Sequence, residues 1–444
     1  MFNKSAAEQL QLIKKGELGI EELVRMYLER IEAYDQGADG LASVSELNPR
    51  ALEEARKMDS QKDRRAPLFG LPILIKDNID VEGLHSTSGS LALADNLVHK
   101  DADVTANLKR NGAIVLGKTN MTEFANYMAE YMPGGYSSRG GQVMHAYDRQ
   151  KNPGGSSSGS GVAVSAGLCS AAIGTDTFFS IVGCATLNGI AGLKPAHGSL
   201  SLRGIIPISH TLDMAGPMTR DLTDALHVYS AMRDTPFEEV KPKNVKELRI
   251  GVNPFRTKRV PEERVAMTDE LMDILKGEGA FVDVVHHPHK IAEDEIMHYE
   301  FRHALEAYLS TSNAKRKTLA EILAFYEEDP EGRMPHGYKY LRKALEEASG
   351  KMDEPEYMQA LKTREAYRRE VYQSLETFDA VLMSGHTGIM HFIGAPSVAL
   401  PIGMAKDGTP MGMILYGKDE RELFSAALTI ERYTERVPLP QKYE

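Results

Sequence analysis

The sequence predicts an α/β protein, because strand-like and helix-like segments alternate along most of the chain. Short apolar runs typical of buried strands occur at 71–80 (LPILIKDNID) and again at 397–402. Apolar residues at helical spacing fill other stretches, beginning with residues 5 to about 36. A chain of 444 residues with 42% hydrophobic and 26% charged side chains can bury a sizeable core. Alternation over such a length is typical of α/β architecture.

The expected elements run in a consistent order. Two helices joined at Gly16 to Gly19 come first, and residues 133–161, dense in Gly, Ser and Pro, are expected to be loop. VAVSAGLCSAAIGTD then reads as a small-residue helix passing into a short strand. The other expected elements are strands at 71–80, 113–116, 247–253, 280–285, 378–384 and 397–402, helices at 102–111 and from near Asn120, and a charged helical layer at about 289–372.

Composition limits the classes of function. The net charge of −11 and the pI near 5.8 argue against a general binder of nucleic acid or anionic membrane. The two cysteines, Cys169 and Cys184, are too few for a disulfide framework and fit a reducing compartment. No secretory signal and no apolar stretch of membrane-spanning length is recognisable. We therefore expect a cytoplasmic protein.

Three short patterns match known motifs without the context that those motifs need. Residues 112–119 (GAIVLGKT) fit a P-loop, but the four middle residues would themselves form the strand. Residues 155–159 (GSSSG) fit a nucleophile elbow, but no strand precedes them. Residues 286–289 (HHPH) suggest a metal site, but no further ligands stand at suitable spacing. We expect Lys118 to be structural and the histidines to lie in a loop.

The stretch GTDTFFSIV (174–182) allows two interpretations. It is either a core strand that happens to contain Ser180 or a turn that presents a reactive serine. Ser156 lies upstream in the Gly/Ser-rich loop, separated from Ser180 by one helix and one short strand. Lys76 ends an apolar strand, where a partly desolvated amine can be neutral and act as a base. Ser–Lys pairs are an accepted alternative to Ser–His–Asp, so nucleophilic catalysis is one of the open interpretations.

The segment PGGSSSGSGVAVSAG, followed by GTDTFFSIVGCATLNGIAGLKP, resembles the defining segment of the amidase signature family. GLPILIKDNID, DADVTANLKRNGAIVLGKTNMTEFA, RGIIPISHTLDMAGPMTRDLTDA and GAPSVALPIGMAKDGTPMG resemble further blocks of that family, in order. The resemblance covers most of the chain and is weakest at about 255–375. The residues of these motifs are most similar to those of the peptide-amidase-like branch, which removes ammonia from C-terminal peptide amides.

The resemblance implies an α/β amidase-signature fold, with a large mixed, mostly parallel, twisted β-sheet covered by helices on both faces. It implies a single domain over 1–444. The catalytic core would take up about 65–225 and 378–430. The charged, helix-rich segment at about 289–372 would pack over this core.

The resemblance also assigns roles to the candidate residues. It implies a Ser-cisSer-Lys triad, with Lys76 as the catalytic lysine, Ser156 as the bridging serine with its cis peptide bond, and Ser180 as the acyl nucleophile. The oxyanion hole would consist of the backbone N–H groups of 177–180, that is Thr177, Phe178, Phe179 and Ser180. Acyl transfer through an acyl-enzyme then needs no metal and no cofactor. Substrate-binding residues stay unassigned.

Phe178 and Phe179 depart from the family, which usually has Gly-Gly at this place. Glycine permits positive φ and close approach of substrate to the backbone. The two rings either pack in the core or line an apolar pocket wall, or they narrow and reshape the acyl site. Ile414, where many relatives carry Gln, and the short segment HTGIMHFIGAP (386–396) also depart.

The leading hypothesis is an amidohydrolase that cleaves a carboxylic or C-terminal peptide amide to the acid and ammonia or an amine. One alternative is the amidase subunit of a tRNA-dependent amidotransferase, which the SSRGGQ and SIV wording disfavours. Another is a catalytically weak relative that binds amides, because of the Phe pair. We expect a small-molecule or peptide amide as the substrate, with no nucleic-acid or membrane partner, and leave a homodimer open.

Overall fold

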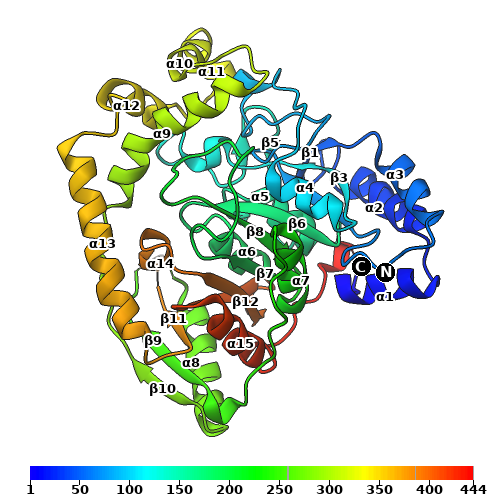
Figure 1. The fold of residues 1–444 in the computed structure, drawn as a ribbon, viewed down its shortest axis with the longest axis vertical. Helices are drawn as coiled ribbons and strands as arrows, with labels where there is room; N and C mark the ends of the chain where they lie inside the picture. Colours follow the sequence, from blue (N-terminus) through cyan, green and yellow to red (C-terminus); the bar gives the residue numbers. More distant parts are fainter. Residues whose placement is uncertain (258–259, 386, 444) are drawn as a thin grey trace.

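The computed structural model describes residues 1–257, 260–385 and 387–443, which are arranged around one large β-sheet (Figure 1). In this described part, eleven strands form the sheet and two short strands form a separate hairpin. In sheet order the eleven strands are β1 (Val44–Leu47), β3 (Ile114–Thr119), β2 (Pro72–Lys76), β6 (Ala171–Asp176), β8 (Met214–Thr219), β7 (Ala191–Lys194), β12 (Ser397–Met404), β13 (Pro410–Tyr416), β11 (Ala380–Met383), β9 (Arg249–Asn253) and β10 (Phe281–Val284), and the hairpin consists of β4 (Tyr136–Ser137) and β5 (Gly141–Gln142).

The sheet is mixed, as expected, but its parallel share is smaller than the sequence suggested. Of the ten strand pairings described in it, four are parallel and six antiparallel. A short turn can join only antiparallel neighbours, and β12 and β13 are joined by such a turn. In addition, β8 lies between β6 and β7 and runs antiparallel to both. These two arrangements, together with the pairing of β12 and β7, account for four of the six antiparallel pairs.

Helices cover both faces of the sheet. Consecutive side chains of a strand point to opposite faces, and β2 shows this plainly: Leu74 belongs to one buried cluster, whereas Ile73 and Ile75 belong to the other. The first cluster packs against α2 (Ile20–Tyr34), α3 (Ala51–Asp59), α5 (Ser158–Ser165), α6 (Val182–Asn188), α13 (Pro355–Leu375) and α14 (Ile389–Phe392). The second packs against α4 (Asp103–Arg110), α7 (Leu222–Met232), α8 (Glu262–Gly277) and α15 (Glu420–Glu431), and α1 (Ala6–Lys15) contributes to both.

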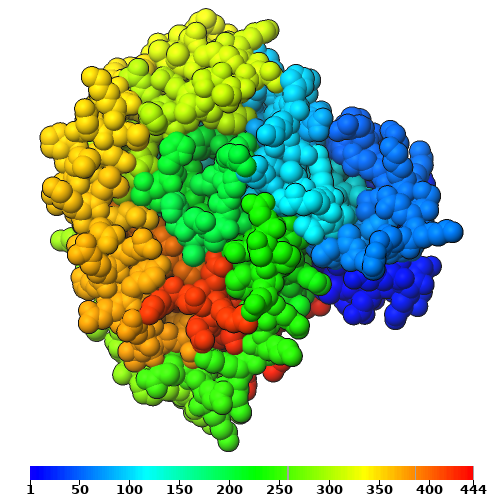
Figure 2. Space-filling model, in the orientation of Figure 1, coloured from blue at the N-terminus to red at the C-terminus, as the bar shows by residue number. Residues whose placement is uncertain are grey.

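The helix-rich segment forms one flank of the molecule, drawn in yellow-green to orange in Figure 2. Besides α13 it contains α9 (Glu293–Thr311), α10 (Leu319–Glu327), α11 (Pro330–Arg333) and α12 (Lys339–Glu347). A third buried cluster joins Phe301 and Tyr326 of this segment to Phe124 and Met128 of the core. This cluster places side chains of the segment against side chains of residues 124 and 128, and the division of a single domain into a catalytic core and a covering segment stays a prediction.

Most sequence-predicted elements are present, including the paired helices α1 and α2 and the parallel pair β9 and β10 around α8. The helix expected from near Asn120 is not. Only a 3₁₀ turn at Glu123–Asn126 occurs there, because Phe124, Ala125 and Asn126 all have positive φ. Further 3₁₀ turns lie at Leu91–Leu93, Val245–Glu247 and Gln441–Tyr443. No helix among the described residues is both long enough and apolar enough to cross a membrane.

Strand β3 (Ile114–Thr119) lies within the 112–119 pattern, as expected, but extends beyond the predicted 113–116, and Lys118 is fully buried in it. Its ammonium donates hydrogen bonds to the backbone carbonyls of Asp77, Ile79 and His85. Burial lowers the pKa of Lys118. The lysine thus ties β3 to the turn that follows β2, which supports the structural interpretation.

Replacing Lys118 by Met removes the donor and leaves three carbonyl oxygens without it. A buried polar group left unsatisfied costs about 1–3 kcal/mol, so we expect the free energy of unfolding to fall by about 2 kcal/mol or more. Urea denaturation measures this change. The exposed Lys100 provides the control: Lys100→Met should change the free energy by less than about 0.5 kcal/mol. Equal effects of the two changes would contradict the structural role.

Candidate active site

Lys76 ends strand β2 at the same edge of the sheet as the end of β6. The two strands are parallel, with Ile75 opposite Ile173, so the residues that follow each strand meet there. The side chain of Lys76 is fully buried. Its Nζ lies 2.8 Å from Ser156 Oγ, 3.0 Å from Ser157 Oγ and 2.8 Å from Thr175 Oγ1.

Burial shifts the titration of this lysine strongly. Removal from water disfavours the ammonium and lowers the pKa of Lys76 to about 7, although Asp176, Cys184 and Asp213 act in the opposite direction. Three of its hydrogen-bond partners are hydroxyl groups, and none is a carboxylate. Lys76 can therefore exchange a proton near neutral pH.

Ser156 connects Lys76 to Ser180. It follows a cis Gly155–Ser156 peptide bond and lies just before α5. Its hydroxyl is within 2.8 Å of Lys76 Nζ and donates a hydrogen bond of 3.0 Å to Ser180 Oγ. Three residues from separate parts of the chain thus form one continuous hydrogen-bonded row.

Ser180 lies in a turn between β6 and α6 and not within a strand. The side chain of Thr177, at the start of the 177–180 loop, donates a hydrogen bond of 2.6 Å to Asp213, whose pKa burial raises to about 6. Phe179 has φ of 66°, in the left-handed region that L-residues rarely adopt. In the described part of the chain, no residue accepts a hydrogen bond from the N–H groups of Thr177, Phe178 or Ser180.

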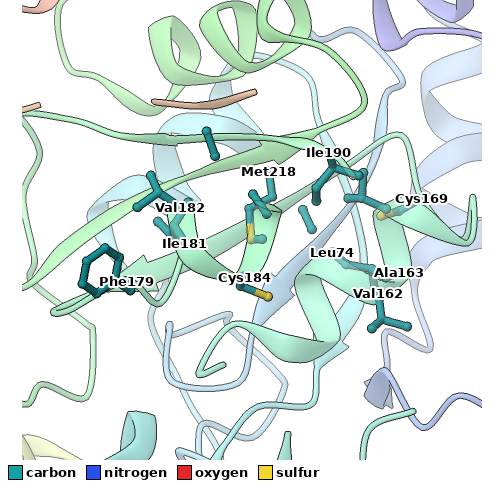
Figure 3. Packing of buried hydrophobic residues seen from close by; sticks show 14 of the residues in the cluster. Leu74, Val162, Ala163, Cys169, Phe179, Ile181, Val182, Cys184, Ile190 and Met218 are labelled. Atoms are coloured by element: carbon teal, nitrogen blue, oxygen red, sulfur yellow. The ribbon is translucent and has the colours of Figure 1, made fainter. Parts of the chain in front are cut away.

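The two phenylalanines have different environments. Phe179 is 8% exposed and packs in the core beside Ile181 and Val182, as Figure 3 shows. The ring of Phe178 is only partly buried and lines a cavity together with Thr177 and Ser180. One ring is thus a core residue and the other a pocket wall.

Two glycines make room for these rings. A Cβ on Gly388 would lie 2.2 Å from the ring of Phe178, and a Cβ on Gly183 would lie 2.9 Å from Cβ of Phe179. Contacts this short essentially never occur, so a side chain at either position would force the neighbouring phenylalanine to move. The Phe pair is therefore accommodated by its surroundings.

The cavity beside Ser180 has a volume of about 270 Å³. Asn126 and Tyr127, from the turn after β3, line one part of it, and Met297 and Tyr340, from the helix-rich segment, line another. A larger hollow of about 750 Å³ lies at α11 and α12, but Ser180 and Lys76 do not line it. The smaller cavity is the one that adjoins the hydrogen-bonded row.

The 155–159 pattern contains Ser156 and Ser157, which both contact Lys76, but it does not follow a strand as a nucleophile elbow does. Ser157, the central serine of the 155–159 pattern, follows a loop and not a strand, and its hydroxyl donates a hydrogen bond to the carbonyl of Thr175. His287 of the 286–289 pattern lies between Tyr416 and Ser374, with 2.6 Å from a ring nitrogen to each hydroxyl.

Sequence reasoning did not single out three further residues of this site: Asp176, Asp213 and His391. Asp176 stands in the quoted stretch, but its contacts depend on the fold. It accepts hydrogen bonds from the N–H groups of Ile181 and Val182. His391 comes from a distant part of the chain, and no pattern in the sequence links it to Ser180.

Comparison with known proteins identifies the family of a chain with this site. The sequence profile of the family described as Amidase matches residues 22–387. The chain belongs to the amidase signature family. This confirms the resemblance stated from the sequence, and the protein is a hydrolase that acts on amides.

Three similar proteins illustrate the range of the family. A probable amidase of Arabidopsis thaliana is 30% identical over 93% of this chain and 86% of its own length. A glutamyl-tRNA(Gln) amidotransferase subunit of Moorella thermoacetica is 30% identical over 98% of this chain and 97% of its own. The crystal structure of the native peptide amidase of Stenotrophomonas maltophilia has a TM-score of 0.90 and 32% identity, over 99% of this chain and 98% of that one. The peptide-amidase-like resemblance is therefore also borne out in structure.

Replacing Phe178 by Ala in this amidase removes a pocket wall. We expect kcat/KM for an amide with a bulky acyl group to rise by about 10-fold relative to that for a small amide, since a few methylenes in an apolar pocket discriminate to this extent. Rates of ammonia release from the two substrates measure the ratio. Phe424→Ala, a buried position on the opposite face, is the control and should lower stability without changing the ratio. An unchanged ratio in Phe178→Ala would show that this ring does not border the bound substrate.

Proposed function

We propose that this amidase hydrolyses a carboxylic or C-terminal peptide amide through a Ser-Ser-Lys triad. Ser180 is the acyl nucleophile, Ser156 the relay and Lys76 the base. The observation that carries the proposal is the unbroken row from Lys76 Nζ through Ser156 Oγ to Ser180 Oγ, with distances of 2.8 and 3.0 Å. A lysine with a pKa of about 7 can accept a proton at neutral pH, which a lysine in water cannot.

The first step is attack by Ser180 on the amide carbonyl. The relay requires the two serine hydroxyls to rotate first, so that Ser180 donates to Ser156 and Ser156 donates to neutral Lys76. As the bond from Oγ to carbon forms, the proton of Ser180 then passes to Ser156, and the proton of Ser156 passes to Lys76. The electron pair of the carbonyl moves to its oxygen. Lys76 can keep two N–H groups directed at Ser157 and Thr175 while its lone pair receives this proton.

Backbone N–H groups stabilise the oxygen anion. We propose Thr177, Phe178 and Ser180 as the donors of the 177–180 loop. The N–H of Phe179, also expected as a donor, instead donates a hydrogen bond to Nε2 of His391 at 3.2 Å. Loss of one donor in such a site typically costs about 2.7–4 kcal/mol of transition-state stabilisation.

The second half of the reaction returns the proton. The intermediate collapses, the carbon–nitrogen bond breaks, and Lys76 returns its proton through Ser156 to the departing ammonia or amine. Water then attacks the acyl-enzyme and gives a proton through Ser156 to Lys76. As the bond between the acyl carbon and Ser180 Oγ breaks, this proton returns through Ser156 to Ser180, and the free acid leaves. The similarity to a peptide amidase supports a C-terminal peptide amide as the substrate.

A second candidate is the amidase subunit of a tRNA-dependent amidotransferase. The similarity to the glutamyl-tRNA(Gln) amidotransferase subunit of Moorella thermoacetica, over nearly the full length of both chains, favours it. Ammonia release from peptide amides by the isolated chain would support the stand-alone hydrolase. Activity on glutamine only in the presence of co-purified subunits would support the amidotransferase. We also propose a cytoplasmic location, which the two buried free cysteines support.

Labelling with a serine-directed phosphonate tests the nucleophile. We expect mass spectrometry to find one adduct on Ser180 and none in Ser180→Ala, which should also release no ammonia from a panel of amides. Ser165→Ala removes a buried hydroxyl on α5 that donates only to Val162, and this control should label normally. The absence of both adduct and ammonia in the unmodified protein would leave a weak amide-binding relative as the better interpretation.

The pH profile tests the base. Below a pH of about 7 Lys76 becomes an ammonium, which cannot accept the proton of Ser156, so kcat/KM should fall about tenfold per pH unit. Above that pH, kcat/KM should reach a plateau. Measurement between pH 5 and pH 9 with an amide that does not itself ionise isolates the enzyme's titration. Lys76→Ala should lose turnover and stay folded; rates like those of the unmodified protein, or a flat profile, would show the assignment of the base to be wrong.

A further inference from the structure

A buried imidazole lies against the 177–180 loop. His391 belongs to α14, on the segment that follows β11, and is 1% exposed. Its Nε2 accepts a hydrogen bond of 3.2 Å from the N–H of Phe179, and its Nδ1 lies 3.2 Å from Oδ1 of Asp176. The ring also contacts the rings of both phenylalanines, with centroids 4.5 Å from that of Phe179 and 5.4 Å from that of Phe178.

The contacts of the His391 ring determine which of its two nitrogens carries the hydrogen. A backbone N–H can only donate, so Nε2 of His391 must present its lone pair to Phe179. The neutral imidazole then carries its hydrogen on Nδ1, which is the nitrogen that lies beside the carboxylate of Asp176. The contact between Nδ1 and Oδ1 is an ion-pair distance and not a hydrogen bond in this structure, so Asp176 favours this tautomer through the charge of its carboxylate.

The carboxylate of Asp176 also binds the residues that follow Ser180 in the turn. Oδ2 of Asp176 accepts hydrogen bonds from the N–H groups of Ile181 at 2.7 Å and Val182 at 3.2 Å. Together, Asp176 and His391 thus bind the N–H groups of three residues around Ser180: the one before it and the two after it. A φ of 66° is unfavourable for an L-residue, and the hydrogen bond from the N–H of Phe179 to His391 helps to offset this cost.

We propose that His391, oriented by Asp176, is a positioning residue of amide hydrolysis. It accepts the N–H of Phe179 and so fixes the left-handed turn from which Ser180 attacks and from which the N–H groups of Phe178 and Ser180 act on the carbonyl oxygen. The proposal rests on the function proposed above, since it deepens the description of the same site.

The alternative is that the imidazole only fills space beside two aromatic rings. A phenylalanine ring would fill the same space without either nitrogen, and a glutamine would bring its carbonyl oxygen to about the place of Nε2. An asparagine reaches only the place of Nδ1. These three replacements separate the hydrogen bond to Phe179 from the packing of the ring.

The experiment measures kcat and KM for one amide with His391→Phe and His391→Gln. It also measures the affinities of a peptide aldehyde, which forms a tetrahedral adduct with a serine, and of the matching alcohol, which does not. In His391→Phe we expect kcat to fall about 10- to 100-fold while KM changes less than about threefold. The affinity for the aldehyde should fall in parallel and that for the alcohol should stay. His391→Gln should recover most of kcat and of the affinity for the aldehyde.

His287→Phe is the matched control, because His287 is also a buried imidazole with two hydrogen-bond partners but does not line the cavity beside Ser180. It should lower the melting temperature and leave kcat unchanged. Normal kcat in folded His391→Phe would overturn the proposal. If that variant does not fold, His391→Gln and His391→Asn decide it: the glutamine variant should be at least about tenfold faster, and equal rates would overturn the proposal. Failure of the proposed function is distinct, because the unmodified protein would then neither label with phosphonate nor release ammonia.

Discussion

The burial of one ammonium group at the end of β2 is the constraint around which the site is organised. Lys76 has a fully buried neighbour on the next strand, Lys118, and burial lowers the pKa of both. Their partners differ. Lys118 donates to three backbone carbonyls and to the hydroxyl of Ser86, whose own hydrogen goes to the carbonyl of Ile79, so Lys118 must remain a donor. Lys76 contacts three hydroxyl groups besides the carbonyl of Thr175, and because a hydroxyl can both accept and donate, the proton between Lys76 and Ser156 can move either way. The same burial therefore makes one lysine a structural tie and the other a candidate base.

The turn that carries Ser180 accommodates two large side chains because glycines stand at neighbouring positions that these side chains contact. Where the resemblance leads us to expect glycines, the chain has Phe178 and Phe179, and the glycines that make room stand at 388 and 183 instead. A phenylalanine keeps a left-handed backbone conformation only where contacts with its surroundings stabilise that conformation. Here the ring packs in the core, and the backbone N–H is bound by a buried imidazole. The departure from the family thus lies within a consistent local structure and need not imply a disrupted site.

Sequence reasoning was most successful where local pattern and family motif agreed. The strands that end at Lys76 and before Ser180 lie where they were predicted, because each combines a distinct apolar run with Gly or Ser at its boundary. The helix after Ser156 is also present, but it begins at Ser158, inside the stretch 133–161 that was expected to be loop. It was less successful where contacts between residues distant in the sequence determine the local structure. The 3₁₀ turn at Glu123–Asn126 stands where a helix was predicted, and the side chain of Glu123 bonds there to Ser138 and to the distant Tyr326, contacts that the local sequence does not reveal. His391 could not be predicted for the same reason, since its partners are a backbone N–H and a carboxylate that only the fold brings near.

The residues of the hydrogen-bonded row and some of the residues that line the cavity come from different parts of the chain. The hydrogen-bonded row comes from segments that match the family strongly, on β2, before α5 and after β6. The outer wall of the cavity comes from Met297 on α9 and from Tyr340 and Lys343 on α12, within the stretch where the resemblance is weakest. Residues that contact only the variable part of a substrate are free to change while the reacting atoms keep their geometry. We therefore expect the substrate preference of this amidase to depend on residues of α9 and α12, which line the cavity together with Phe178.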